Sequence, residues 1–401
     1  MNQAPMRTVQ YIVKVSKLCN LRCKYCYEMP ELGNPERMSL EQLDRMYTHL
    51  ADHYGSLEEP IRIVFVWHGG EPLLQSPDLY WATFARQQEI FGAGGRVVVE
   101  NVVQSNLTVL DEERIRLLRE GFKGVGVSID LFGGLRVNLA QRDSQARVLA
   151  NIDKLRAARV PFGGITVLTQ RNLKQVTKIF RFYERMNMNF RILPLFPGAF
   201  EDQHAEYAIT PDEVLEALCT LADLWLESDR NIQITPLVGH FQEAIKHLQG
   251  DSLPVYYNRR EWETAVMVNT NGDVFGYPEA YDPAFCYGNI FTTSMSALLA
   301  SENREKSLKG SELRMAGACA QCPYFGSCSG FYMAEESPEG GSAGPQGVAM
   351  CHVEQRLIRH IEARLKQTGL FAGSKQLDQQ WMRAKHLDGP VEENASLGVL
   401  A

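Results

Sequence analysis

Short apolar runs alternate with amphipathic stretches along the first half of the chain. Six of these runs are rich in β-branched and aromatic residues and end in turns or polar loops, which is the pattern of buried strands. The expected strands cover residues 11–15, 61–66, 97–104, 125–130, 163–169 and 190–196. A series of strand–helix units predicts a parallel sheet with right-handed crossovers, built as an open barrel or as a doubly wound sheet.

Helical patterns lie between these strands and continue after the last one. Residues 40–55 place apolar side chains on one face, Ser39 and Gln42 have the spacing of a capping box, and Gly55 can end the helix. Further helices are expected over residues 111–121, 144–159 and 172–185 and from Thr210 onward, and a hairpin is expected to turn at Asn271-Gly272. The pattern therefore changes character after about residue 200.

The composition excludes several classes of protein. With 401 residues and 45% hydrophobic residues, the chain is long enough for two domains or one large domain with an appendage. A formal charge of −7 gives no general reason to bind nucleic acid or an anionic membrane. The start of the chain lacks the apolar region of a signal peptide, and no run approaches the ~18 apolar residues of a membrane helix. We expect a cytoplasmic protein without nucleic-acid or membrane partners.

Three of the nine cysteines, Cys19, Cys23 and Cys26, stand within eight residues after the first expected strand. Thiols in a reducing compartment serve metals or catalysis more often than disulfides, and an odd trio cannot pair off internally. Structural zinc sites usually take four protein ligands. Three thiolates in one loop with no fourth nearby favour an iron–sulfur cluster with one open iron, and a zinc knuckle is the alternative.

Polar residues also stand where the other expected strands end. Gly69-Gly70-Glu71 follows the second strand, and Gln104, Ser105 and Asn106 end the third. Ser128 and Asp130 end the fourth. Since the carboxyl ends of parallel strands meet at one edge of a sheet, we expect these residues near the cysteine loop. His68, beside the two glycines, is expected to be a packing residue.

The C-x3-C-x2-C spacing, with Tyr25 before the last cysteine, resembles the signature of the radical S-adenosylmethionine (SAM) superfamily. The resemblance implies a [4Fe–4S] cluster on Cys19, Cys23 and Cys26, whose open iron chelates SAM and whose electron cleaves SAM to a 5′-deoxyadenosyl radical. It also implies that Glu71 accepts the SAM ammonium. The implied SAM contacts are Tyr25, Gly69, Gly70, Glu71, Gln104, Ser105, Asn106, Ser128, Asp130 and Arg142. For Asp130 the alternative is a loop cap, and for Arg142 a solvated arginine at a helix start.

A second group, Cys319, Cys322, Cys328 and Cys351, resembles the SPASM extension of radical SAM enzymes that modify peptides. The resemblance implies two auxiliary clusters for a complete pattern of seven cysteines. Here Tyr277 and Tyr332 occupy positions where the inner cluster needs thiolates, and no cysteine precedes Gly272 within reach. The sequence therefore predicts one auxiliary [4Fe–4S] cluster, held by the four cysteines, with a zinc ribbon as the alternative.

The resemblance implies an α/β fold: a partial (β/α)6 TIM-like barrel of the radical SAM type with a C-terminal cysteine-rich SPASM-like module. The expected boundaries are residues 8–200 for the barrel, 201–259 for a helical linker region, 260–355 for the module, and 356–401 for a C-terminal helix and tail.

The implied function is maturation of a ribosomally made precursor peptide, with a three-residue cyclophane between an aromatic ring and a nearby β-carbon as the favoured product. Such an enzyme needs a reducing partner such as flavodoxin or ferredoxin. Glu279 or Asp282 is a candidate general base, and a loop salt bridge is the alternative for either. The rival functions are formylglycine formation of the sulfatase-maturase type, whose pattern keeps all seven cysteines, other Cβ–X couplings, and a non-catalytic iron–sulfur or zinc scaffold or electron carrier.

Overall fold

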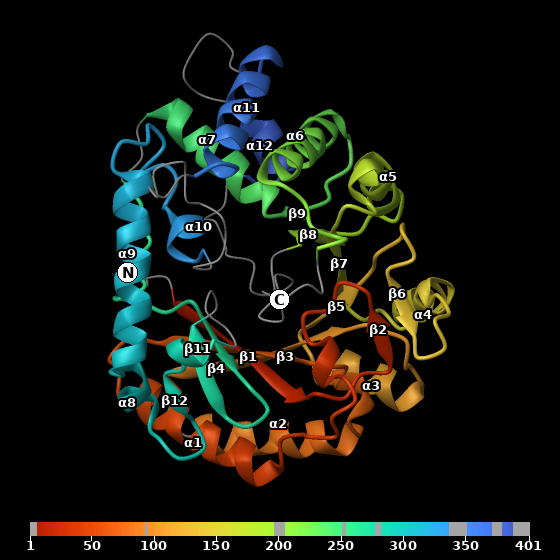
Figure 1. Cartoon of the computed structure of the whole chain (residues 1–401), viewed down its shortest axis with the longest axis vertical. Coiled ribbons are helices and arrows are strands. Elements are labelled where there is room, and N and C mark those ends of the chain that lie inside the picture. The colour runs from red at the N-terminus through yellow and green to blue at the C-terminus, as the bar shows by residue number, and fades with distance from the viewer. Residues whose placement is uncertain are drawn as a thin grey trace.

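The computed structural model describes residues 6–92, 95–195, 205–250, 254–276, 282–336, 351–370 and 379–387. Figure 1 shows a curved central sheet with helices along its outer side. Two residues singled out in the sequence, Tyr277 and Glu279, lie outside the described residues.

A ten-stranded sheet in the order β12-β11-β10-β1-β3-β4-β5-β7-β8-β9 is the centre of the fold. Its strands are β1 (Arg7–Ser16), β3 (Ile61–Gly69), β4 (Val97–Ser105), β5 (Gly124–Ser128), β7 (Phe162–Leu168), β8 (Phe190–Pro194), β9 (Ile234–Thr235), β10 (Ala265–Val268), β11 (Asp273–Gly276) and β12 (Gly288–Asn289). All neighbours from β10 to β9 are parallel, and the β10–β11–β12 edge is antiparallel. The six predicted strands are confirmed, and they are adjacent in chain order.

Helices pack outside the sheet and at its far end (Figure 1). The capping boxes of the first and sixth helices are present, with Ser39 and Gln42 at one and Thr210 and Glu213 at the other. The helices are α1 (Leu40–Gly55), α2 (Pro77–Phe91), α3 (Glu112–Glu120), α4 (Gln145–Ala157), α5 (Val176–Arg185), α6 (Pro211–Glu227), α7 (Leu237–Gln249), α8 (Met295–Leu299), α9 (Glu302–Cys319), α10 (Phe331–Ala334), α11 (Glu354–Gln367) and α12 (Gln379–Ala384). Short 3-10 turns cover Met29–Glu31, Pro72–Leu74, Leu173–Gln175 and Pro283–Phe285.

The two faces of β1 serve different cores. Tyr11 and Val13 pack with the outer helices in the large hydrophobic core, whereas Ile12 packs on the opposite face with Val64 and Phe275 in a second, smaller core. This alternation follows from the two-residue period of a strand. Both faces of β1 are therefore buried, and the loop that leaves its carboxyl end starts from a rigid position.

The sheet does not end where the sequence placed the boundary between barrel and later regions. Strand β9 comes from the region predicted as a helical linker, and it pairs with β8. The predicted hairpin forms β10 and β11, and β10 pairs with β1 over four residues from Gln10↔Ala265 to Val13↔Val268. Chain segments more than 250 positions apart thus share one sheet. No helix in the described part of the chain is both long and apolar enough to span a bilayer.

Candidate functional site

The first three cysteines lie in the loop that leaves β1, and a small antiparallel sheet supports that loop. Strand β2 (Leu21–Cys23) pairs with β6 (Arg136–Asn138), which places Cys23 opposite Arg136. A tight turn follows, in which the amide of Cys26 donates to the carbonyl oxygen of Cys23 over 2.9 Å. The three cysteines share one small packing cluster, so the structure brings the predicted trio together.

Gly69 and Gly70 hold the beginning of this loop against the end of β3. Gly69 has a φ of +118°, and a Cβ there would lie 2.2 Å from the carbonyl oxygen of Ser16. A Cβ at Gly70 would lie 2.4 Å from the carbonyl oxygens of both Lys17 and Leu18. The amide of Gly70 donates to the Ser16 carbonyl over 2.8 Å. This close backbone approach requires glycine at both positions.

The carboxylate of Glu71 is buried and joins two neighbouring strand ends. Its Oε1 accepts hydrogen bonds from the Ser105 hydroxyl at 2.8 Å and the Leu73 amide at 2.9 Å. Its Oε2 accepts from the Asn106 amide at 2.7 Å. Burial raises the pKa of Glu71, and these hydrogen bonds offset only part of that rise. Glu71 thus binds the end of β4 as well as facing the region of the cysteine loop.

Amide side chains at the end of β4 connect the same region further. Asn106 directs its Nδ2 at the Cys19 sulfur, 3.8 Å away, and at the Asn20 side-chain oxygen, 3.0 Å away. Gln104 donates through Nε2 to the Ser128 hydroxyl on β5 at 2.7 Å. The other amide atom of Gln104, Oε1, is buried and has no hydrogen-bond partner in the described structure. A buried acceptor of this kind fits a ligand that supplies a donor.

Asp130 is fully engaged by protein groups. Its Oδ2 accepts from the Tyr25 hydroxyl and, at 3.2 Å, from Nη1 of Arg136, while its Oδ1 accepts from the Val167 amide at 2.9 Å. Nη1 of Arg136 also donates to the Tyr25 hydroxyl over 2.9 Å. The bond to the Val167 amide fits the alternative stated for Asp130, a loop cap, and contact of Asp130 with SAM stays a prediction.

Arg136 is the functional candidate that sequence reasoning missed. It is largely buried beside the cysteine loop, and its Nε atom has no hydrogen-bond partner in the part of the chain that the structure describes. Arg136 lies in a three-residue strand, which is too short to give a periodic signal. Arg142, which was predicted to contact SAM, is exposed on the turn before α4.

Burial controls the chemistry of the trio. It raises the pKa of the Cys19 thiol to about 12, with a further contribution from the negative charge of Glu71, and it raises the pKa values of Cys23 and Cys26. Buried thiols with raised pKa values remain protonated at neutral pH unless a cation stabilises the thiolate. The three thiols would therefore become thiolate ligands only when a cationic centre binds between them.

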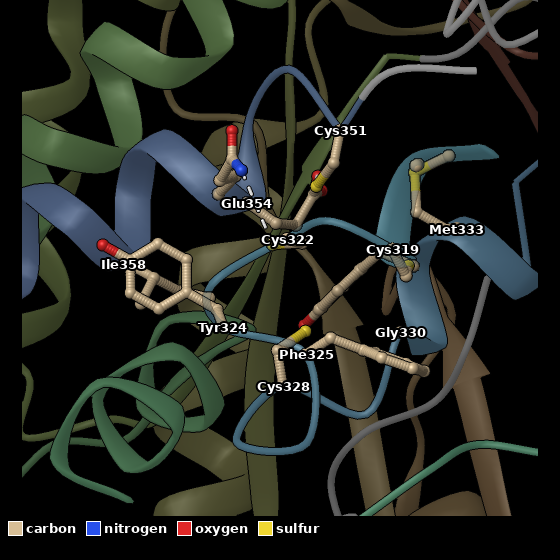
Figure 2. Close-up of a pocket in the computed structure, with 13 residues that line it drawn as sticks. Cys319, Cys322, Tyr324, Phe325, Cys328, Gly330, Met333, Cys351, Glu354 and Ile358 are labelled. Carbon is tan, nitrogen blue, oxygen red and sulfur yellow. Dashed lines mark hydrogen bonds between the residues drawn. The ribbon is translucent and has the colours of Figure 1, made fainter. Parts of the chain in front are cut away.

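The four C-terminal cysteines line one pocket (Figure 2). Cys319 ends α9, and the amide of Cys322 donates to its carbonyl oxygen over 3.0 Å. Cys328 follows in the same loop, and Cys351 stands just before α11. The structure therefore collects all four predicted auxiliary ligands around a common space.

Polar groups of α11 contact these thiols. Nε2 of Gln355 donates to the Cys322 sulfur at 3.5 Å, and the Cys351 thiol donates to Oε2 of Glu354 at 3.3 Å.

Tyr332 also lines the pocket, and its ring lies 4.9 Å from that of His240. Burial raises the pKa of Tyr332 well above the usual value of a phenol.

Both groups of cysteines fit an iron–sulfur cluster by donor chemistry. Three thiols in a loop leave one iron free for a further ligand, and four thiols around one pocket supply the number of ligands that a complete cluster needs. Across the described ranges, no three His, Cys, Asp or Glu side chains converge closely enough to surround a single metal ion.

The candidate base Asp282 caps a short turn. Its Oδ1 accepts from the Ala284 amide at 2.9 Å, and the residue is exposed. The base assignment stays a prediction for Asp282 and for Glu279, which lies outside the described residues.

The chain is similar to known proteins in sequence and fold. Residues 13–183 match the model of the Radical SAM superfamily. The chain is 24% identical over 356 residues to the serine-type anaerobic sulfatase-maturating enzyme of Bacteroides thetaiotaomicron, covering 82% of this chain and 83% of that protein. It is 22% identical to the cysteine-type enzyme of Clostridium novyi, covering 80% and 87%.

Solved structures share the fold. Histidine-tagged anSMEcpe with bound AdoMet superposes with a TM-score of 0.71 at 17% identity, over 95% of this chain and 98% of that one. Streptococcus suis SuiB bound to S-adenosylmethionine superposes with a TM-score of 0.54 at 13% identity, over 83% and 76%. The predicted α/β fold with a mostly parallel central sheet is confirmed. The similarity to the Radical SAM superfamily model covers residues 13–183, from β1 to the end region of α5.

Proposed function

We propose that this enzyme uses SAM to abstract a Cβ hydrogen from a residue of a peptide substrate. The similar sulfatase-maturating enzymes act on a protein, and solved structures of similar fold include anSMEcpe with bound Cp18Cys peptide and SuiB with precursor peptide SuiA. These likenesses support a peptide substrate.

One observation carries the proposal: the cysteine loop, the Gly69-Gly70-Glu71 turn and the end of β4 form one connected unit. Backbone contacts join the turn to the loop, and Asn106 reaches both Glu71 and the Cys19 sulfur. A bound [4Fe–4S] cluster supplies the electron that cleaves SAM and produces the 5′-deoxyadenosyl radical.

The chain's own residues would hold SAM beside that cluster. Glu71 offers an anionic acceptor for the ammonium group. Gln104 and Ser128 lie on adjacent strands, and the unpartnered Oε1 of Gln104 is an acceptor for a ribose hydroxyl. The Tyr25–Asp130–Arg136 group fixes the opposite side of the cysteine loop.

The four cysteines of the pocket would hold one auxiliary [4Fe–4S] cluster, which would supply a one-electron acceptor. Tyr332 stands where an inner cluster would need a thiolate, and its raised pKa opposes ionisation and ligation. We therefore favour a chain with two clusters. Flavodoxin or ferredoxin would be the partner that reduces the SAM-binding cluster.

For the product, we favour a crosslink between the Cβ and an aromatic ring. The Cβ radical adds to the ring, and loss of one electron and one proton restores aromaticity. The absence of the inner-cluster cysteines from the sequence favours this product over formylglycine. Formylglycine formation is the second candidate, because sulfatase-maturating enzymes match about four-fifths of the chain.

The test supplies reduced enzyme and SAM with two peptides: a sulfatase-type peptide bearing Ser or Cys, and a precursor peptide with an aromatic residue near a Cβ-deuterated residue. We expect deuterium in 5′-deoxyadenosine and a precursor peptide that has lost two hydrogens. A product that a hydrazide captures contains an aldehyde and supports the formylglycine candidate. Addition of a methyl group refutes both.

A further inference from the structure

The charge of this protein is distributed unevenly. The whole chain has a formal charge of −7, but residues 142–187 contain ten Lys and Arg against three Asp and Glu, a formal charge of +7. This segment holds α4, β7 and α5. One of its acids, Glu184, is already engaged by Arg181 at 2.8 Å and by the Ser228 hydroxyl at 2.5 Å. An acidic enzyme therefore presents one strongly basic region.

A groove is lined by residues of α4 and α5 from this region and by Leu131 and Phe132, which precede it in the chain. Its apolar lining includes Phe132 and Phe182, and Lys178, Arg181 and Arg185 stand exposed along it. None of the nine described residues that line the groove is an Asp or Glu. Apolar side chains surrounded by charges of one sign are the anatomy of a protein-docking surface. The charge selects an acidic partner.

The groove is connected to the cysteine loop by a short piece of chain. Phe132 lines the groove, and Leu135, three residues later, packs in the same small cluster as Cys23. The Lys24 amide donates to the Leu135 carbonyl over 2.9 Å, and Arg136 pairs with Cys23. Three residues span at most ~11 Å of backbone. The groove is therefore close to the first cluster site and is formed by different elements from those of the auxiliary pocket.

We propose that the α4–α5 groove is the docking surface for a small acidic protein that carries a one-electron donor. The inference rests on the proposed function, because reductive SAM cleavage consumes an external electron. One electron leaves the reduced partner and enters the [4Fe–4S] cluster held by the trio. The partner is oxidised by one electron, the cluster is reduced by one, and no bond forms or breaks in the transfer.

An acidic segment of the peptide substrate is the competing occupant, since it has the same charge. The position favours the electron donor. The groove is lined by the outer helices α4 and α5, and residues 132–136 lead from it to Arg136, which pairs with Cys23 between β6 and β2.

The experiment measures binding and electron delivery separately on the holoenzyme. Lys178→Glu, Arg181→Glu and Arg185→Glu are combined in one variant. The matched control combines Arg45→Glu, Arg116→Glu and Arg119→Glu, three exposed arginines of α1 and α3, and has the same change in net charge. Purified flavodoxin and ferredoxin are the probes, with calorimetric Kd values at low and high salt.

We expect the groove variant to weaken probe binding at least about tenfold, and wild-type binding to weaken as salt screens the charges. Flavodoxin-driven formation of 5′-deoxyadenosine should fall in parallel, while dithionite-driven formation stays at the wild-type level. The control variant should match the wild type in all three assays. A milder variant replaces the same three residues, Lys178, Arg181 and Arg185, by Gln, which removes the charges without reversing them. It should weaken probe binding and flavodoxin-driven turnover less than the Glu variant does.

Three results would overturn the assignment. The first is equal probe affinity in the groove variant and the wild type, or no binding of either probe to the wild type at low salt. The second is loss of dithionite-driven turnover in a folded groove variant. That loss would show that the three substituted side chains are needed for SAM binding or for the structure of the enzyme, and not for docking of the partner. The third is a raised KM for the peptide with unchanged probe affinity, which would assign the groove to the substrate. If the wild type forms no 5′-deoxyadenosine even with dithionite, the proposed function fails, and the binding data still decide the docking surface.

Discussion

The two cysteine sites are held in opposite ways. The first three cysteines stand within eight residues, yet the groups that fix them come from strand ends far along the chain, among them Gly70, Asn106 and Arg136. The last four spread from Cys319 to Cys351, and they lie at the ends of the helices α9 and α11 and in the loop after α9. The first site belongs to the central sheet, and the second lies among helices.

This difference predicts that the sites can be disabled separately. A change in the sheet contacts should affect the first site and leave the second intact, whereas removal of the second should leave SAM cleavage intact. The following variants test that separation, beginning with the largest expected effect.

Removing the cysteines should give the clearest separation. The Cys19→Ala, Cys23→Ala, Cys26→Ala variant should lose SAM cleavage altogether, because no iron remains to bind the cofactor. The Cys319→Ala, Cys322→Ala, Cys328→Ala variant should still cleave SAM.

Iron and sulfide analysis after anaerobic reconstitution provides the measurement. The wild type should contain roughly eight irons per chain and each triple variant roughly four. Deoxyadenosine from the first variant would contradict the assignment of the trio. About twelve irons in the wild type would indicate an inner cluster, and stoichiometric zinc with four irons would make the second site a zinc ribbon.

Gly70→Ala should damage the first site through backbone geometry alone. The new Cβ would lie 2.4 Å from two carbonyl oxygens of the cysteine loop, so the loop must move. We expect SAM cleavage to fall ~100-fold, a loss of ~3 kcal/mol, with the auxiliary iron retained. Gly55→Ala is the matched control, because nothing lies within 4 Å of its added Cβ. Equal loss of iron from both sites in Gly70→Ala would show that they fold as one unit.

Glu71→Gln should have a smaller effect that is confined to SAM binding. Loss of the anionic partner of the ammonium should cost ~1.5–3 kcal/mol, which is a ~10–150-fold weaker affinity. Equilibrium dialysis with radiolabelled SAM measures this change. Unchanged SAM affinity together with weaker peptide binding would assign Glu71 to the substrate instead.

The pH dependence of stability provides an independent check on Glu71. Burial raises its pKa above the ordinary value of 4.5, so between these two pKa values the native state binds more protons than the unfolded chain. This group therefore makes the free energy of unfolding fall as the pH rises from about 4.5 through the raised pKa. Glu71→Gln lacks this titration. The advantage of the wild type over the variant in denaturant titrations should shrink as the pH rises, and a growing advantage would contradict the burial argument.

Gln355→Leu should have the smallest effect, and only on the second site. The variant removes the donor that lies 3.5 Å from the Cys322 sulfur. Loss of one hydrogen bond worth ~0.5–1.5 kcal/mol should move the potential of the auxiliary cluster ~20–60 mV lower. Redox titration followed by electron paramagnetic resonance measures both clusters in one sample. A shift of the SAM-binding cluster would show coupling between the sites.

The sequence predicted the sheet well because its signals are local. Apolar runs, capping boxes such as Ser39 with Gln42, and the Asn271-Gly272 turn each act over a few residues. The strand-end rule also placed the Gly69-Gly70 turn and Asn106 beside the cysteine loop, since parallel strands end at one edge.

The remaining features depend on contacts that no local pattern encodes. Arg136 lies in a three-residue strand that forms only by pairing with the cysteine loop. The engagement of Asp130 by Tyr25 joins positions 105 residues apart, and the pairing of β9 with β8 extends the sheet into a predicted linker. The α4–α5 groove depends on how residues of two helices and the loop at residues 131–132 come together in space, which the sequence of neither helix encodes.

The pairing of β10 with β1 has a consequence for the order in which the protein is made. Gln10 meets Ala265, which is synthesised 255 residues later. At ~5–20 residues per second, β1 therefore waits roughly 13–50 s on the ribosome with one edge unpaired. An open, apolar strand edge is a template for aggregation, and here the cysteine loop follows it directly. A nascent chain that stops before residue 265 exposes both the open edge of β1 and the cysteine loop. We therefore expect chaperone contact with β1 to end when the β10–β11 hairpin emerges.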